Sequence, residues 1–146
     1  PLQGIEDIAS YISFRKLIEA EAAARAATNV NAQTLSELRA ILEELDRAID
    51  ANTATLDLDN QFHFRIADLS DNRFLIETLK MLRPYMYFVG TFLRSLGSTG
   101  YLKGKRSMTC EHYKILNAIE AKDADAARKA VIEHFDASEQ RVFKGE

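Results

Sequence analysis

Four residues of this chain could together bind a transition metal ion. Asp59 and His63 lie four residues apart in a segment whose apolar spacing predicts a helix, and His112 and His134 are the only other histidines among the 146 residues. Side chains at positions i and i+4 share one face of a helix, and imidazole and carboxylate groups are ligands that divalent transition metals prefer. We therefore predict a metal site made of one carboxylate and every histidine of the chain.

The helical phase of these four residues places each of them on a face that packs inward. A buried carboxylate is costly unless it is paired or bound to a cation. One interpretation is that the four side chains converge on a metal between facing helices, as is common in helical bundles. The other is that each histidine is hydrogen-bonded in the core, with Asp59 bonded to His63 within their helix. The stripes that carry the four residues are Leu56–Asp59–His63–Ile66, Met108–His112–Ile115–Ile119 and Ala127–Ala130–His134–Ser138.

Arg15 interrupts another apolar stripe, Ile8–Ile12–Arg15–Ile18. Its stem could pack at the edge of the stripe while its head reaches water or pairs with Glu19. Alternatively, its guanidinium lies inside the bundle and offers two coplanar donors to a carboxylate. The spacing leaves both interpretations open, and the second would make Arg15 a carboxylate-binding residue.

The composition favours an ordered helical domain and excludes several classes of partner. The chain has 47% hydrophobic residues, and its 19 basic and 22 acidic residues are scattered, so no basic face for duplex DNA is expected. The single cysteine excludes an intramolecular disulfide and is typical of the cytoplasm. No apolar run approaches the roughly 20 residues of a membrane span, so no membrane partner is expected. The chain starts at Pro1 without a methionine, so it is either a fragment of a longer protein or a domain that stands alone.

Apolar spacing close to 3.6 residues predicts an all-α fold, an antiparallel bundle of about six helices with a central metal and ligand cavity. Residues 1–146 would form one domain by length. Pro84 predicts a kink within the fourth helix, and the aromatic residues that follow it, including Phe88 and Phe92, are expected in the core. Glycines 97, 100 and 104 predict a loop over 97–104. Four predicted helices span residues 5–27, 54–69, 73–96 and 105–121. Another runs from a cap at Asn31 or Thr34 to residue 51, and the last runs from a cap at Asp123 to residue 142.

Three segments resemble the FadR-type C-terminal effector domain, or FCD domain, of GntR-family bacterial transcription regulators. Residues 14–23 (FRKLIEAEAA) are similar to the opening helix of that family. Residues 58–67 (LDNQFHFRIA), followed by Asp71 and Asn72, look like its Asp-x-x-x-His segment and the start of the next helix. Residues 111–119 (EHYKILNAI), with Asp123, Ala127 and His134 after them, resemble its closing motif.

The resemblance implies a helical bundle that is joined to an N-terminal winged helix and acts as a homodimer. In the metal-binding branch of the family, an aspartate and three histidines hold a divalent ion, with zinc as the first expectation here and nickel or manganese as alternatives. Asp59, His63, His112 and His134 match these ligands. Arg15 matches an arginine that meets the carboxylate of a small organic acid. Binding to DNA is implied only through a winged-helix domain that is missing from this chain.

The resemblance and the residues together predict a ligand-sensing regulatory domain and not an enzyme. Metal and effector would bind between helices and bias the arrangement of a dimer. The alternative is a metal-dependent enzyme acting on a small carboxylic acid, because histidine ligands with open metal positions can activate water or a substrate oxygen. No candidate general base stands near the four ligands other than the ligands themselves.

Overall fold

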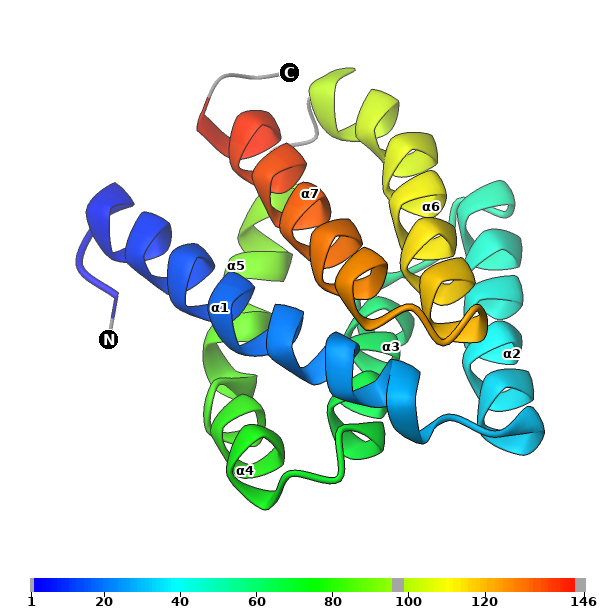
Figure 1. Ribbon diagram of the computed structural model, residues 1–146. Helices are drawn as coiled ribbons and strands as arrows, with labels where there is room; N and C mark the ends of the chain where they lie inside the picture. Colours follow the sequence, from blue (N-terminus) through cyan, green and yellow to red (C-terminus); the bar gives the residue numbers. More distant parts are fainter. Residues whose placement is uncertain (1, 96–98, 144–146) are drawn as a thin grey trace.

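The computed structural model of this protein consists of α-helices joined by short turns (Figure 1). It describes residues 2–95 and 99–143, and it describes side chains up to residue 95 and again from residue 108. All regular secondary structure in these ranges is helical, as predicted from the sequence. The helices are α1 (Ile5–Asn29), α2 (Ala32–Asp50), α3 (Leu56–Leu69), α4 (Arg73–Met81), α5 (Arg83–Ser95), α6 (Thr99–Glu120) and α7 (Ala124–Phe143).

Short polar side chains begin several of these helices. The Asn31 side chain accepts a hydrogen bond from the Thr34 backbone N–H at 2.9 Å, and the Thr34 hydroxyl accepts one from the Asn31 N–H at 2.9 Å. This reciprocal capping box satisfies backbone donors that have no partner inside the helix. Asn72 caps α4 in a similar way, and Asp123 accepts from the Ala126 N–H at 3.0 Å. The predicted caps at Asn31 and Asp123 are confirmed.

Helix α1 packs closely against several other helices, and most of its buried side chains are small. It packs against α7 and α3 and also contacts α6 and α4 (Figure 1). Alanine lets a neighbouring helix approach closely, and the core around α1 is completed by larger side chains such as Phe62 on α3 and Leu38 on α2. The alanines of α1 that are buried are Ala20, Ala22, Ala23, Ala24, Ala26 and Ala27.

The predicted fourth helix is in fact two helices, so the described ranges hold seven helices and not about six. The chain leaves α4 at Leu82 and re-enters a helix at Arg83, with Pro84 as the second residue of α5. Proline is tolerated in the first turn of a helix because the N–H groups there have no intrahelical acceptor. Pro84 therefore marks the start of a helix where the sequence predicted a kink.

The loop predicted over residues 97–104 is wrong where the structure describes it. Helix α6 already includes Thr99, Gly100 and Gly104 in its first two turns, while residues 97 and 98 lie outside the described residues. A glycine inside a helix costs only about 1 kcal/mol relative to alanine. Packing of a long helix can offset that cost, which local sequence signals do not reveal.

The aromatic residues of α5 are less buried than predicted. Phe88 is 59% exposed and Phe92 is 42% exposed, so neither belongs to the core. Phe14 and Leu17 of α1 and Phe74 of α4 are exposed as well. Within the described ranges, no helix is both long enough and apolar enough to cross a membrane.

Candidate metal and effector site

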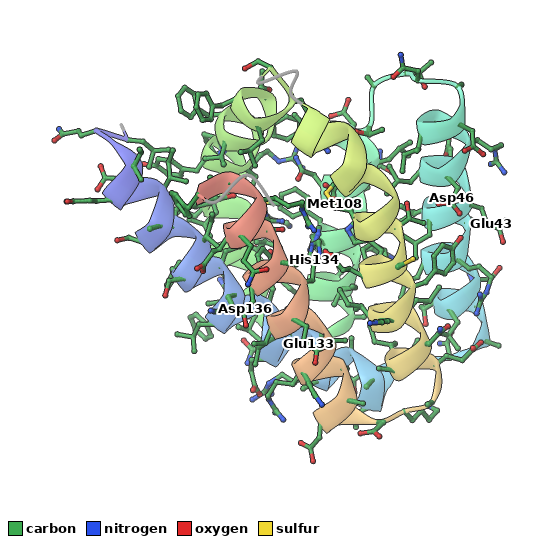
Figure 2. The ribbon with its side chains drawn as sticks, turned by 90° about the horizontal axis from the view of Figure 1, so that it is seen from above. Glu43, Asp46, Met108, Glu133, His134 and Asp136 are labelled. Atoms are coloured by element: carbon green, nitrogen blue, oxygen red, sulfur yellow. The ribbon has the colours of Figure 1, made fainter. Side chains whose placement is uncertain are left out.

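The three histidines meet in the interior, between α3, α6 and α7. One ring nitrogen from each of His63, His112 and His134 lies within 4.8 Å of the corresponding nitrogens of the other two. All three side chains are buried. Figure 2 shows His134 on the inner side of α7, whereas Glu133 and Asp136 lie on the outer side of the same helix. Helices that are far apart in the sequence therefore bring every histidine of the chain to one place.

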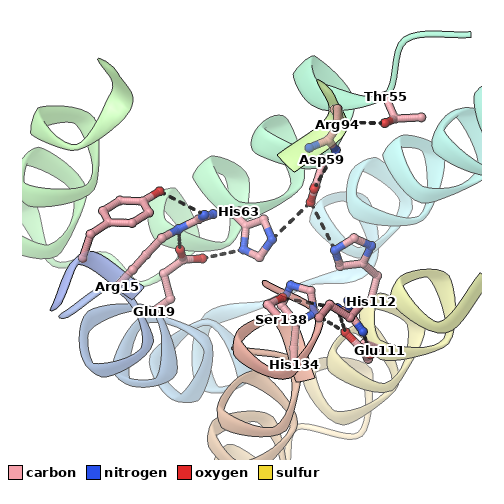
Figure 3. Close-up of polar contacts among 12 residues, drawn as sticks. Arg15, Glu19, Thr55, Asp59, His63, Arg94, Glu111, His112, His134 and Ser138 are labelled. Atoms are coloured by element: carbon pink, nitrogen blue, oxygen red, sulfur yellow. Dashed lines mark hydrogen bonds and ion pairs between the residues drawn. The ribbon is translucent and has the colours of Figure 1, made fainter. Parts of the chain in front are cut away.

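Asp59 joins this cluster from one turn before His63 on α3 (Figure 3). Its Oδ1 atom lies 3.3 Å from His63 Nε2 and 3.2 Å from His112 Nε2. Its Oδ2 atom accepts a hydrogen bond from Arg94 at 3.3 Å. The structure thus brings together the four residues that the sequence analysis singled out as metal ligands.

Several polar atoms of the cluster have no hydrogen-bond partner among the described residues. They are Asp59 Oδ1 and both ring nitrogens of His112, and all are buried. The short approach of His112 Nε2 to Asp59 Oδ1 does not have hydrogen-bond geometry. A buried polar atom without a partner costs roughly 1–3 kcal/mol. A divalent cation would satisfy Asp59 Oδ1 and one ring nitrogen of His112, and nitrogen and carboxylate ligands suit zinc and its neighbours in the first transition row.

Two carboxylates orient two of the imidazoles from behind. His63 Nδ1 donates to Glu19 Oε1 at 2.5 Å, and His134 Nδ1 donates to Glu111 Oε1 at 2.7 Å. A proton held on Nδ1 leaves the Nε2 lone pair directed away from the carboxylate. This is the arrangement by which outer carboxylates fix the orientation of metal-binding histidines and raise their basicity.

Each of these carboxylates is in turn held by an arginine. Arg15 Nε donates to Glu19, and Arg15 also donates to the Tyr11 hydroxyl at 3.3 Å. Arg141 donates to both oxygens of Glu111, each at 2.9 Å. Burial opposes the ionisation of both glutamates, but their arginine and histidine partners outweigh it and lower the pKa of each to about 2. Both glutamates are therefore ionised at neutral pH.

The pKa values of His63 and His134 are shifted in opposite directions. Burial lowers the pKa of His63, but Glu19 and Asp59 outweigh that effect and raise it to about 9. Burial, helped by the nearby rings of His112 and His63, lowers the pKa of His134 to about 4 despite the hydrogen bond to Glu111. In the absence of a metal, His63 would thus be protonated at neutral pH. Metal binding at its Nε2 would release a proton.

A cavity of about 110 Å³ opens beside Asp59, His63 and His134. One water needs only about 10–15 Å³ by a comparable measure, so the cavity can hold a small organic molecule. His112 does not line it and instead borders a separate void of about 10 Å³. The polar residues that line the cavity, apart from these metal-ligand candidates, are Tyr11, Arg15, Asn60, Arg94, Ser138 and Arg141.

Arg15 combines features of the two interpretations that the sequence left open. It pairs with Glu19, as expected for the first, and it also lines the cavity, as the second requires. Its guanidinium lies 5.0 Å from the ring centroid of Phe135, which covers one face of it. Glu19 and the nearby Tyr11 raise the pKa of Arg15 despite burial, so it is charged at any physiological pH.

Sequence reasoning missed Arg94, Glu111 and Arg141. Arg94 ends the apolar face of α5 that carries Val89 and Gly90, and a charged residue continuing such a face is a signal that could have been followed. Glu111 and Arg141 carry no comparable signal, because only the packing of α6 against α7 brings them together.

The chain is similar to known transcription regulators. A family model described as the FCD domain matches residues 11–137. The "Uxu operon regulator" of Haemophilus influenzae is 27% identical over 131 residues, covering 89% of this chain and 49% of the relative. The "Uxu operon transcriptional regulator" of Escherichia coli K12 is 26% identical over 132 residues, covering 89% and 51%. The chain thus spans about half the length of these relatives.

Solved structures confirm the fold. The structure titled "E. coli McbR/YncC" aligns with a TM-score of 0.82 at 19% identity, covering 99% of this chain and 68% of the other. The structure titled "Streptococcus agalactiae GntR" aligns with a TM-score of 0.73 at 21% identity, covering 88% and 56%. The all-helical architecture is therefore shared with solved GntR-type proteins.

Proposed function

Since the chain belongs to the FCD domain family, we propose that it senses a small organic acid through a bound divalent metal ion and so controls a GntR-family transcription regulator. The observation that carries this proposal is the convergence of Asp59 and three histidines beside a cavity lined by arginines. DNA would be bound by a winged-helix domain outside this chain. The greater length of the relatives leaves room for such a domain.

Asp59, His63, His112 and His134 would hold the metal, with zinc as the first expectation and nickel or manganese as alternatives. When bound, the ion would supply a concentrated positive charge that attracts an anion into the cavity. Glu19 and Glu111 would keep the His63 and His134 rings in place for it. The fit is supported by the buried atoms of Asp59 and His112 that no other described group satisfies.

The carboxylate of the effector would lie between the metal and the guanidinium of Arg15. Arg15 lines the cavity, is charged, and has a planar head suited to paired hydrogen bonds with a carboxylate. Arg94 adds a second guanidinium beside Asp59. An anionic ligand is thus favoured over a neutral one by the charges that surround the cavity.

Helix α1 connects this cavity to the surface through which the domain would form a homodimer. Its inner face carries Arg15 and Glu19, and its outer face carries Phe14 and Leu17, which line a broad groove between α1, α4 and α7. The groove is largely apolar and has charges of both signs at its edge, which suits a second copy of the same surface. A ligand that favours one position of α1 would shift the dimer toward one arrangement by its difference in affinity between the two.

Sensing is favoured over catalysis by the surroundings of the cluster. Glu19 and Glu111, the carboxylates nearest to the histidines, are each engaged with an arginine and an imidazole and are poorly placed to accept a proton from a substrate. The curated relatives quoted above are named as regulators.

Metal analysis and calorimetry on the purified chain test the proposal. We expect about one divalent ion per chain and acid binding that requires this ion. His112→Ala should lose both, whereas Glu133→Gln, a change on the exposed face of α7, should lose neither. Protein that is fully folded without metal and binds organic acids equally well would refute the proposal.

A further inference from the structure

Asn60 carries a buried donor that no described protein group accepts. The residue is 3% exposed, it lines the cavity, and its Nδ2 atom has no hydrogen-bond partner. Buried side-chain amides are nearly always hydrogen-bonded. An unsatisfied amide beside a cavity that is large enough for a small molecule therefore indicates a contact with a ligand.

The other strong donors of the cavity already serve acceptors of the protein. Arg15 donates to Glu19, Arg141 donates to Glu111, and Arg94 donates to Asp59. A ligand must share these guanidiniums with protein carboxylates. Apart from the Tyr87 hydroxyl, whose approach lacks hydrogen-bond geometry, no described acceptor competes for Asn60 Nδ2, so a ligand gains this hydrogen bond at little cost.

The position of Asn60 sets the shape of the ligand. It follows Asp59 on α3, and consecutive residues of a helix point in directions about 100° apart. A molecule that reaches both the metal cluster and Asn60 must extend around α3 toward α5. There α5 contributes the apolar side chains of Met86, Val89 and Leu93 to the wall, with Arg94 at the end of the helix. Asn60 is thus a polar contact placed away from the metal, against an apolar wall.

The charges around the cavity indicate what the ligand presents to Asn60. The three arginines balance the three carboxylates of Asp59, Glu19 and Glu111, so the two positive charges of a bound divalent ion would remain. An acid with one carboxylate would neutralise half of them, and an acid with two would neutralise both. A second carboxylate would also offer oxygen acceptors to the Asn60 amide.

We propose that Asn60 is a specificity-determining residue that selects a small dicarboxylate. One carboxylate lies at the metal and Arg15, and the other accepts a hydrogen bond from Asn60 Nδ2. This inference rests on the proposed function and adds to it the chemical class of the effector. It distinguishes dicarboxylates from simple alkanoates of the same chain length.

Asn60 has one structural role that a test must separate from ligand binding. The Tyr87 hydroxyl of α5 donates to Asp57 at 2.7 Å, and this bond raises the pKa of Tyr87 while nearby Asn60 acts in the opposite direction. The contact of Asn60 with Tyr87 does not have hydrogen-bond geometry. If Asn60 served only to support α5, Tyr87→Phe would reproduce the effect of changing Asn60.

Calorimetry of the zinc-loaded full chain with succinate and butyrate tests the inference, because these acids differ only in a terminal carboxylate. Wild type should prefer succinate. Asn60→Ala should weaken succinate binding by roughly 10- to 150-fold, the effect of losing one hydrogen bond to a charged group, and should leave butyrate unchanged. Asn60→Asp, which keeps the size of the side chain but replaces the donor with a negative charge, should weaken succinate binding further. Gln61→Ala, on the exposed side of α3, is the matched control.

Equal weakening of both acids by Asn60→Ala, unchanged succinate binding, or the same loss in Tyr87→Phe would overturn the role of Asn60 and leave the proposed function standing. Failure of the zinc-loaded wild type to bind either acid would overturn both.

Discussion

Replacing Glu111 with glutamine tests whether the carboxylates behind the histidines support the metal site. Glutamine keeps the size of the side chain and one acceptor oxygen, but it loses the charge that meets His134 and Arg141. The ionised form of Glu111 is favoured in the folded protein by its low pKa of about 2, compared with an ordinary 4.5. That difference corresponds to roughly 3 kcal/mol. Because one acceptor remains, we expect Glu111→Gln to lower the free energy of unfolding of the metal-free protein by about 1.5–3 kcal/mol at pH 7.

The sign of the pH dependence follows from the same pKa. A carboxyl whose pKa is lowered by folding stabilises the folded state above its unfolded value of 4.5, and this stabilisation is lost as the pH falls toward 2. The difference in stability between wild type and Glu111→Gln should therefore shrink as the pH falls through this range. Urea unfolding at several pH values measures it.

The metal affinity should also fall, by roughly 10- to 100-fold, as is usual when the partner of a metal-binding histidine is lost. Zinc titration against a competing chelator measures this affinity. Glu133→Gln, with an exposed side chain one residue from His134, is the control and should change neither stability nor affinity noticeably. Wild-type zinc affinity in a Glu111→Gln protein that is clearly destabilised would show that Glu111 supports the fold but not the metal, and would refute the reasoning.

Three further substitutions probe the cavity and the core around it. Arg15→Ala should retain metal but bind organic acids roughly tenfold more weakly or worse, since a charge-assisted contact is lost; unchanged affinity by calorimetry would leave Arg15 as a partner of Glu19 alone. Gly90→Ala places a methyl group 2.4 Å from Leu56 Cδ1, so Leu56 must turn aside. Stability should stay within about 1 kcal/mol because alanine favours the helix, while acid binding weakens; a thermal shift and a titration on the same sample separate the two effects. Phe62→Ala removes a fully buried ring that contacts the edges of His63 and His112, and urea unfolding should show a loss of roughly 3–5 kcal/mol.

The sequence predicted well which faces of the helices are buried. It predicted poorly which side chains of other helices those faces contact. The inward positions of His63, His112 and His134 follow from helical periodicity alone, because phase along a helix depends only on spacing. The Arg15–Glu19 pair is local to one helix and was among the alternatives. Capping by Asn31 is local as well, and it was predicted for the same reason.

Contacts between helices could not be predicted in this way. The hydrogen bond from Arg94 to Asp59 joins residues 35 positions apart, and that from Arg141 to Glu111 joins residues 30 positions apart. Neither contact can be inferred from the apolar periodicity of the helices that carry the two residues. The start of α6 was also missed, since Gly100 and Gly104 lower helix propensity locally, and propensity is a weak guide within a folded chain.

The gathering of every histidine at one site makes the protein its own reporter. In a nuclear magnetic resonance spectrum, each imidazole signal of this chain would come from the cluster and from nowhere else. Occupancy, proton release and the approach of a ligand could then be followed at the site without labels. The same feature makes a polyhistidine purification tag a competitor, because a tag would carry more imidazoles than the protein itself and could draw the metal away from the site.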